Sequence, residues 1–276
     1  MKNKTKDLQH LSSNQYASAD KLHARWGLYT FAIPSIDIHQ TGIDRLKLNG
    51  DEDILEVGCG DGSVLLNLRR QGHEGKLVGL EITDGMFRES IKAQNKENLQ
   101  PPVKFIVGSA DNLPFPDKSF NVILAFFMLY HMPDIQKTLR EWKRVLRDDG
   151  KLLISTASAV NKPKHKKFKK MVEALIGKTA SPHFSSSFNL ENAEEQLAGT
   201  LKIVDKFIYE GQIKIEKTQP YLYAFNSIRD MYEPIPSNID WGKAENMVRV
   251  EIEKEIAQNG FFTDSVRRGF FICEKL

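Results

Sequence analysis

Residues 56–62 combine an acid with closely spaced glycines, a pattern well suited to binding a small charged ligand. The segment reads Glu-Val-Gly-Cys-Gly-Asp-Gly. Glycine lets the backbone turn tightly and approach a ligand closely, while a carboxylate needs a partner that donates hydrogen bonds or carries positive charge. An apolar pair precedes the segment and a helical pattern follows it, which predicts a strand, a turn and a helix start. The candidate ligand-binding residues of this turn are Glu56, Gly58, Cys59, Gly60 and Gly62.

Two other glycine-rich nucleotide sites fit this turn less well. The dinucleotide fingerprint G-x-G-x-x-G needs a third glycine at position 63, where the chain has Ser63. A phosphate-binding P-loop ends in G-K-[ST]; the match at residues 177–179 is remote and has Val172 in place of the first glycine. For the turn taken alone, a nucleotide dehydrogenase and a purely structural turn stay open as alternatives.

A second acid, Glu81, ends the next apolar strand pattern at residues 76–80. It lies about 20 residues beyond the glycines, where doubly wound folds place an acid that binds ribose hydroxyls. The oxygens of one carboxylate can accept a hydrogen bond from both hydroxyls. Ile82 and Met86 follow closely and suit the face of an adenine, although both are equally compatible with the core.

Two further segments carry polar residues just past predicted strands. Residues 103–107 form a strand pattern that leads into Gly-Ser-Ala-Asp-Asn-Leu-Pro-Phe-Pro-Asp at 108–117, followed by Ser-Phe-Asn at 119–121. Residues 122–125 form the next strand pattern. It leads into Phe126, Tyr130 and His131, ahead of Met-Pro-Asp at 132–134.

Together these segments resemble the class I S-adenosylmethionine-dependent methyltransferases, and within them the ubiquinone-biosynthesis-like (type 11) branch, over about residues 50–157. The resemblance implies S-adenosylmethionine as cofactor, with adenine held by an acid and the backbone amide after it. Ser109 occupies that acid position here; it can still accept a hydrogen bond, and Asp111 is the alternative acid. The implied cofactor residues outside the turn are Glu81, Ile82, Met86, Ser109, Ala110, Asp111 and Phe126.

Strands and helices alternate up to residue 157, which predicts βαβ units and an α/β fold with a doubly wound, mostly parallel sheet. The resemblance implies seven strands with an antiparallel last one, and residues 269–273 are similar to that strand. We expect an N-terminal helical lid (1–45), a cofactor-binding core (46–157), an inserted cap with the acceptor region (158–262) and the final core strand (263–276). Within the cap, residues 203–209 and 212–216 alternate like strands of a hairpin around Gly211.

Methyl transfer to an oxygen, nitrogen or carbon nucleophile is an in-line displacement, so the protein mainly has to orient its reactants in a dry pocket. A general base is needed only if the nucleophile must lose a proton. His131 is the preferred candidate, because imidazole titrates near neutral pH, and Tyr130 is a weaker one. His131 is equally compatible with packing at a helix start. Aromatic and polar residues of the predicted lid and cap are candidates for acceptor binding: Tyr16, His23, Trp26, Tyr221, Tyr223 and Phe225.

The composition of the chain bears on its ligands and on its cellular compartment. The 276 residues carry a formal net charge of +3, which gives no strong nucleic-acid signature. The two distant cysteines form no disulfide framework and fit the cytoplasm. There is no apolar run of about 18 residues, so no membrane span is expected, and no metal-ligand spacing is present. The sequence does not predict the oligomeric state or the acceptor.

Two alternatives to a small-molecule methyltransferase stay open. One is an RNA methyltransferase that grips phosphates with the lysine-rich helix at residues 162–170. A solvated helix face is the simpler interpretation of these lysines, because the apolar positions already follow helical spacing. The other alternative is a regulatory protein that binds S-adenosylmethionine without transferring its methyl group.

Overall fold

The computed structural model describes residues 16–177, 186–232, 235 and 240–276. Two compact units contain these residues. The first unit is drawn from residues 1–36, 160–183 and 209–267, and the second from 37–159, 184–208 and 268–276. Each unit is therefore built from three separate stretches of the chain. No helix in the described part of the chain is both long and apolar enough to cross a membrane.

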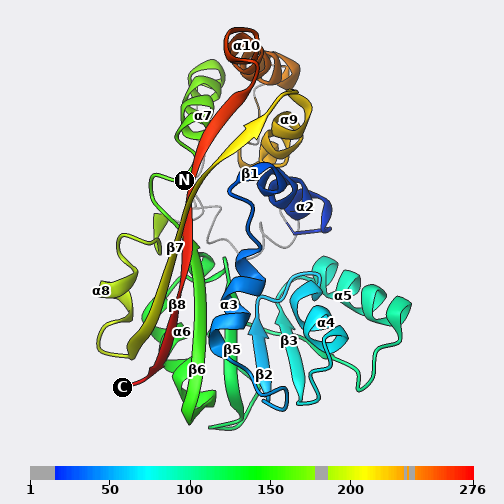
Figure 1. The fold of residues 1–276 in the computed structure, drawn as a ribbon, viewed down its shortest axis with the longest axis vertical. Coiled ribbons are helices and arrows are strands. Elements are labelled where there is room, and N and C mark those ends of the chain that lie inside the picture. Colours follow the sequence, from blue (N-terminus) through cyan, green and yellow to red (C-terminus); the bar gives the residue numbers. More distant parts are fainter. Residues whose placement is uncertain (1–15, 178–185, 233–234, 236–239) are drawn as a thin grey trace. The chain divides into compact units, whose positions relative to one another are not determined.

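A sheet of mostly parallel strands forms the second unit, as predicted (Figure 1). Its parallel strands are β2 (Ile54–Val57), β3 (Leu77–Glu81), β4 (Lys104–Val107), β5 (Phe120–Phe126) and β6 (Leu146–Ala157). They lie in the order β6-β5-β2-β3-β4. The last strand, β8 (Phe262–Lys275), pairs antiparallel with β6 through residues 268–274. The predicted antiparallel final strand is thus confirmed.

The described strands follow the order β1-β7-β8-β6-β5-β2-β3-β4, so the sheet has eight strands instead of the seven expected. The added strand, β1 (Ala32–Ile33), pairs antiparallel with β7 (Leu201–Ile215). The predicted hairpin around Gly211 is wrong, because residues 201–215 form one continuous strand. Gly211 permits close approach instead of a turn: a Cβ there would lie 2.7 Å from the carbonyl oxygen of Ile33.

Two of the helices described in the second unit begin at a capping aspartate. The described helices of this unit are α3 (Ile38–Leu46), α4 (Ser63–Arg70), α5 (Asp84–Glu97), η3 (Leu129–His131), α6 (Ile135–Val145) and α8 (Ala193–Leu197). The side chain of Asp37 caps α3 and that of Asp134 caps α6 by accepting backbone N–H bonds. The apolar face of α6 is buried, with Leu139 and Trp142 fully enclosed.

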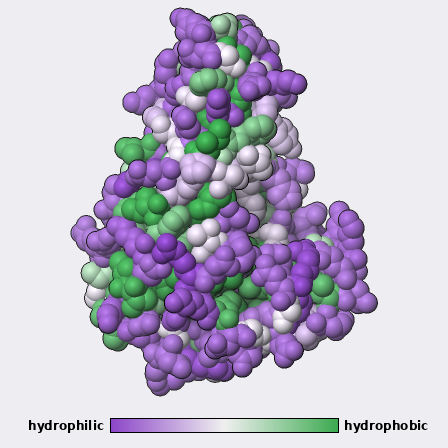
Figure 2. Space-filling view, in the orientation of Figure 1, coloured by the Kyte–Doolittle hydropathy of each residue, from purple (hydrophilic) through white to green (hydrophobic). Residues whose placement is uncertain are grey.

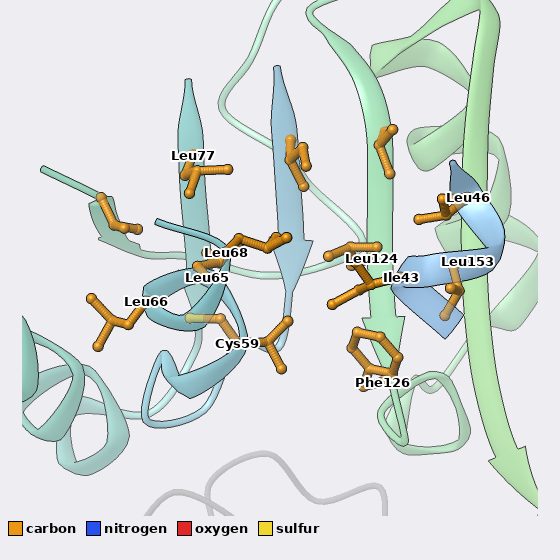
Figure 3. Close-up of a cluster of buried hydrophobic side chains, with 14 of the residues drawn as sticks. Ile43, Leu46, Cys59, Leu65, Leu66, Leu68, Leu77, Leu124, Phe126 and Leu153 are labelled. Atoms are coloured by element: carbon orange, nitrogen blue, oxygen red, sulfur yellow. The ribbon is translucent and has the colours of Figure 1, made fainter. Parts of the chain in front are cut away.

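In the hydrophobic core of the second unit, side chains of α3 and α4 pack against the sheet (Figure 3). Ile43 and Leu46 enter from α3, and Leu65 and Leu68 enter from α4. Phe126, at the end of β5, lies at the border of this cluster. Burying such side chains stabilises the fold by about 1.5–3 kcal/mol each, so the turn lies on a rigid base.

The first unit consists mainly of helices. These are α2 (Asp20–Gly27), η2 (Leu28–Phe31), α7 (Pro163–Ile176), α9 (Gln219–Asn226), η5 (Arg229–Tyr232) and α10 (Trp241–Asn259). The predicted amphipathic helix is present as α7, which buries Phe168, Val172 and Ile176. Phe168 packs against Tyr221 and Phe262 in an aromatic core. Hydrophilic side chains cover much of the face shown in Figure 2.

Candidate functional site

The glycine turn has the backbone conformation that its sequence indicates. Gly58, Gly60 and Gly62 all have positive φ angles, of 67°, 57° and 76°. At Gly62 a side chain would also collide with the core, since a Cβ would lie 2.5 Å from Cζ of Phe105. The backbone N–H groups of Gly58 and Cys59 both donate to the carbonyl of Leu80, which ties the turn to β3. Gly62 is therefore needed both for its backbone freedom and for its lack of a side chain.

Glu81 holds the turn from the end of β3. Its Oε2 accepts a hydrogen bond from the Gly60 N–H at 3.0 Å, and its Oε1 accepts from the N–H groups of Ile82 and Thr83 at 2.9 Å. A carboxylate offers about four acceptor positions, so one remains for a ligand where two were expected. Burial raises the pKa of the Glu81 carboxyl, and the backbone donors oppose that rise.

Glu56 is the other acid of the site, and it is buried. Its Oε2 has no hydrogen-bond partner in the part of the chain that the structure describes. Burial raises the pKa of Glu56 well above its ordinary value, and the nearby carboxylates of Asp61 and Glu81 raise it further. A buried carboxyl oxygen without a partner is unfavourable. A ligand that brings a cationic hydrogen-bond donor would relieve that cost.

These groups lie at one edge of the sheet because the strands that carry them are parallel. Glu56 pairs in register with Gly79 of β3 and with Leu124 of β5. Glu81 and Phe126 are the last residues of β3 and β5. In open α/β sheets, ligands bind outside the carboxyl ends of the strands. The structure therefore brings the predicted turn, both acids and Phe126 to the edge where a ligand is expected.

The loop after β4 completes this edge. Ser109 donates a hydrogen bond from Oγ to Oδ1 of Asp111 at 2.6 Å. Lys137 of α6 donates to Oδ2 of the same carboxylate at 3.0 Å. Ala110, which lies between Ser109 and Asp111 in the chain, is buried. Its carbonyl accepts a hydrogen bond from Nε1 of Trp142 at 2.9 Å. Both candidate adenine acceptors, Ser109 and Asp111, are thus parts of one hydrogen-bonded group.

The remaining predicted cofactor residues surround the same edge. Met86 is fully enclosed in α5, and Ile82 is half-buried. Cys59 is buried, and burial raises the pKa of its thiol well above the ordinary value, so the thiol stays protonated. Met86 and Cys59 are thus apolar packing residues in this structure. No group of three or more potential metal ligands occurs among the described residues.

Comparisons with known proteins place this site in a family. Residues 55–154, from the glycine turn through most of β6, match the methyltransferase domain family. A demethylmenaquinone methyltransferase from Listeria welshimeri is 28% identical over 196 residues, which cover 68% of this chain and 76% of the relative. The family match identifies residues 55–154 as a methyltransferase domain. Its cofactor is S-adenosylmethionine, as predicted.

Solved structures support the fold of this methyltransferase. The YcgJ protein from Bacillus subtilis superposes with a TM-score of 0.56 at 18% identity, covering 86% of this chain and 97% of that one. The cyclase SpnF superposes with a TM-score of 0.55 at 18% identity, covering 86% of this chain and 80% of that one. A cyclase on the same fold illustrates that this architecture supports more than one chemistry.

His131, the predicted general base, lies in the short helix η3. His131 is buried, and its ring lies edge-on to that of Tyr130 at 4.6 Å. The His131 N–H donates to the carbonyl of Met128, and the carbonyl of Tyr130 accepts from Oγ of Ser187. Met128 also lies against the turn, since a Cβ on Gly58 would be 3.1 Å from Cβ of Met128. The predicted base therefore lies three residues along the chain from a residue that packs on the turn.

His39 lies at the site although sequence reasoning missed it. Its ring contacts Phe126 edge-on at 4.6 Å, and Phe127 at 6.0 Å. Burial lowers the pKa of His39 to about 4. The charge of Asp37 raises this pKa, and the charge of Arg268 lowers it further. The imidazole is therefore neutral at physiological pH. The local signal was only a capped helix start at Asp37, and nothing in the sequence indicates that α3 brings this ring to the end of β5.

All predicted acceptor residues belong to the first unit, whereas the cofactor residues belong to the second. Tyr221 and Phe225 are fully buried in the aromatic core of the first unit. Tyr223 is 56% exposed on the same helix, α9. Arg25 lies over the ring of Tyr16 at 5.6 Å, Trp26 is half-buried, and His23 is exposed. Of the three aromatic residues on α9, only Tyr223 is accessible within its own unit.

Proposed function

We propose that Glu56, the glycine turn and Glu81 bind S-adenosylmethionine, and that the acceptor is a small molecule of the demethylmenaquinone type. The buried, unpartnered Oε2 of Glu56 carries the cofactor assignment. The amino acid end of S-adenosylmethionine carries an ammonium group, which is the cationic donor that this oxygen requires. The named relative supports the acceptor class.

Glu56 and Glu81 have different roles in this proposal. Glu56 accepts from the ammonium group of the cofactor, because the described residues offer its Oε2 no donor. Glu81 accepts from one ribose hydroxyl with its remaining acceptor position, while its other positions keep the turn in shape. Ile82 and Phe126 supply apolar contacts, and the residues after β4 meet the adenine.

Substitution of Glu56 tests the binding site with little effect on the turn. Glu56→Gln should weaken S-adenosylhomocysteine binding by about 1.5–3 kcal/mol, or ten- to a hundred-fold, since a charge-assisted hydrogen bond is lost. Glu89→Gln, on an exposed side chain of α5, is the matched control. Titration calorimetry measures both variants. Unchanged affinity of the Glu56 variant would refute the assignment.

A proton should also be released on binding. The raised pKa favours the protonated form of the Glu56 carboxyl in the free protein, whereas a cationic ligand favours the ionised form. Affinity should therefore increase with pH up to the raised pKa. The measured binding enthalpy should depend on the ionisation enthalpy of the buffer, and this dependence should vanish in Glu56→Gln.

When bound, S-adenosylmethionine supplies a methyl group already activated by its sulfonium. The chain then has to orient the acceptor and, where the nucleophile carries a proton, remove it. We assign the removal of that proton to His131, with Tyr130 as the weaker candidate. His131→Gln should reduce kcat at neutral pH and leave cofactor affinity nearly unchanged. A variant with normal kcat and an unaltered pH profile would exclude His131 as the base.

Acceptor binding is assigned to those candidate residues of the first unit that are at least partly exposed: Tyr16, His23, Trp26 and Tyr223. Tyr223 gives the cleanest test, because it is exposed and its loss leaves the aromatic core of its unit intact. Tyr223→Ala should lower turnover and spare cofactor affinity. Demethylmenaquinone in detergent micelles and a metabolite panel, each with labelled S-adenosylmethionine, identify the acceptor. Binding of cofactor with no transfer to any acceptor would favour the regulatory alternative.

The contacts of the lysine-rich helix support a small-molecule acceptor over RNA. Lys164 forms an ion pair with Glu255 at 2.5 Å, and Lys167 forms one with Glu251 at 2.8 Å. Both acids lie on α10 of the same unit. These charges are therefore already balanced within the protein. We further propose a cytoplasmic location, supported by two buried free thiols.

A further inference from the structure

Phe127 has an unfavourable backbone conformation just past the carboxyl end of β5. Its φ is 52°, in the left-handed region that bulky side chains avoid. Among the described residues, the others with a positive φ are glycines, lysines and one asparagine, so Phe127 is the only aromatic one. Lys47 and Asn98 end the helices α3 and α5, where a left-handed residue closes the last turn. Phe127 lies between β5 and η3 and ends no helix, so its conformation needs another explanation.

Ser155 holds this conformation from the neighbouring strand. Its Oγ accepts a hydrogen bond from the N–H of Phe127 at 2.9 Å. Phe126, the preceding residue, is in register with Ser155 in the parallel pair of β5 and β6. Ser155 is fully buried, so its hydroxyl is shielded from competition with water. The unfavourable backbone of Phe127 is therefore fixed by a residue of the sheet.

The Phe127 ring is partly exposed at this edge of the sheet, although its neighbours in the chain are buried. From residue 122 to residue 132, Phe127 is the only residue that is not buried. The ring of His39 lies edge-on to it at 6.0 Å. A half-exposed ring gains only part of the free energy of burial, so packing alone does not account for a phenylalanine on a strained backbone. Strained residues that the surrounding structure holds in place cluster at ligand sites.

We propose that Phe127 binds the flat aromatic ring of the acceptor, and that Ser155 is its positioning residue. Met128, the residue after Phe127, packs against Gly58 of the cofactor turn, so a ring in contact with Phe127 lies next to the proposed cofactor site. Aromatic rings pack well against one another in edge-to-face and offset arrangements, which an aliphatic acceptor does not offer. Phe127 thereby determines specificity for an aromatic acceptor. This inference rests on the proposed function, whose acceptor is of the demethylmenaquinone type.

Acceptor kinetics of Phe127 variants test the proposal, with reduced demethylmenaquinone in detergent micelles as the probe. Phe127→Gly should raise the KM for this acceptor about ten-fold, the value of one partly buried aromatic contact, and keep the affinity for S-adenosylhomocysteine. Phe127→Tyr retains the ring and should keep the KM. Phe207→Ala is the matched control, because Phe207 is also half-buried against the same hydrophobic core. It should lower stability without a change in KM.

Stability measurements separate the backbone of Phe127 from its ring. In urea unfolding, Phe127→Gly should be more stable than Phe127→Ala, because glycine adopts a positive φ without strain. Both variants should nevertheless raise the KM alike, since both lack the ring. Ser155→Ala should raise the KM in the otherwise unsubstituted protein and have no further effect in the Phe127→Gly background.

The possible outcomes distinguish this inference from the proposed function. An unaltered KM in Phe127→Gly, or an equal increase in Phe207→Ala, would overturn the role of Phe127 while leaving the cofactor site intact. An unaltered KM in Ser155→Ala would overturn the positioning role of Ser155. Failure of the unsubstituted protein to methylate demethylmenaquinone, with S-adenosylhomocysteine still bound, would overturn the acceptor class of the proposed function and this inference together.

Discussion

Substitution of Gly62 by alanine separates two reasons for a glycine in the turn. Gly62 has a φ of 76°, and a Cβ would lie 2.5 Å from Cζ of Phe105 and 3.0 Å from Cβ of Ser90. The left-handed backbone costs a non-glycine residue about 1–2 kcal/mol. Overpacking against the buried ring adds about 1–3 kcal/mol. Gly62→Ala should therefore lower the free energy of unfolding by about 2–5 kcal/mol.

Gly72 provides the matched control. Its φ is 90°, and no atom would lie within 4 Å of an added Cβ, so Gly72→Ala should cost only the backbone term of about 1–2 kcal/mol. Urea unfolding followed by circular dichroism measures both variants. Phe105→Leu removes the colliding ring and should cost less in the Gly62→Ala background than alone. Equal losses for the two glycine variants, with no coupling to Phe105, would refute the steric argument.

Three further outcomes are expected. The pKa of His39 is lowered to about 4 in the folded protein, whereas it is about 6.5 in the unfolded chain. As pH falls, the unfolded chain therefore binds this proton before the folded protein does. The free energy of unfolding should decrease between pH 6.5 and 4 by at most about 3 kcal/mol. His39→Gln should flatten that dependence, and an imidazole NMR titration with a midpoint near 6.5 would contradict the prediction. Tyr221→Phe removes a 2.9 Å hydrogen bond to a buried carboxylate and should cost about 1–3 kcal/mol in urea unfolding; Tyr223→Phe, at an exposed position, should change little. Lys166→Glu with Lys170→Glu should leave methyl transfer unchanged, whereas tight, salt-dependent tRNA binding that this pair abolishes would restore the RNA alternative.

Local sequence patterns determined the parts of the site that depend on backbone conformation. Three glycines at alternate positions need left-handed φ angles or close approach, and all three have positive φ. Short apolar segments predicted β2, β3 and β5, because parallel strands are buried on both faces and therefore consist mostly of apolar residues. Since those strands are parallel, the residues after them necessarily meet at one edge. The acids Glu56 and Glu81 could thus be assigned to one site before any contact was known.

Which partner each side chain finds was decided by tertiary structure alone. The sequence predicted Glu81 as a ligand residue, but its carboxylate also accepts from the N–H of Gly60 in the distant glycine turn and from the N–H groups of Ile82 and Thr83. Gly211 looked like a turn residue, yet it lies in a continuous strand because another strand approaches it closely. His39 reaches Phe126 from a helix far away in the sequence. Periodicity and glycine content report steric limits within a few residues, whereas hydrogen-bond partners depend on how distant segments pack. The sequence therefore determined the turn, the strands and the cofactor class, and the packing decided the use of each polar atom.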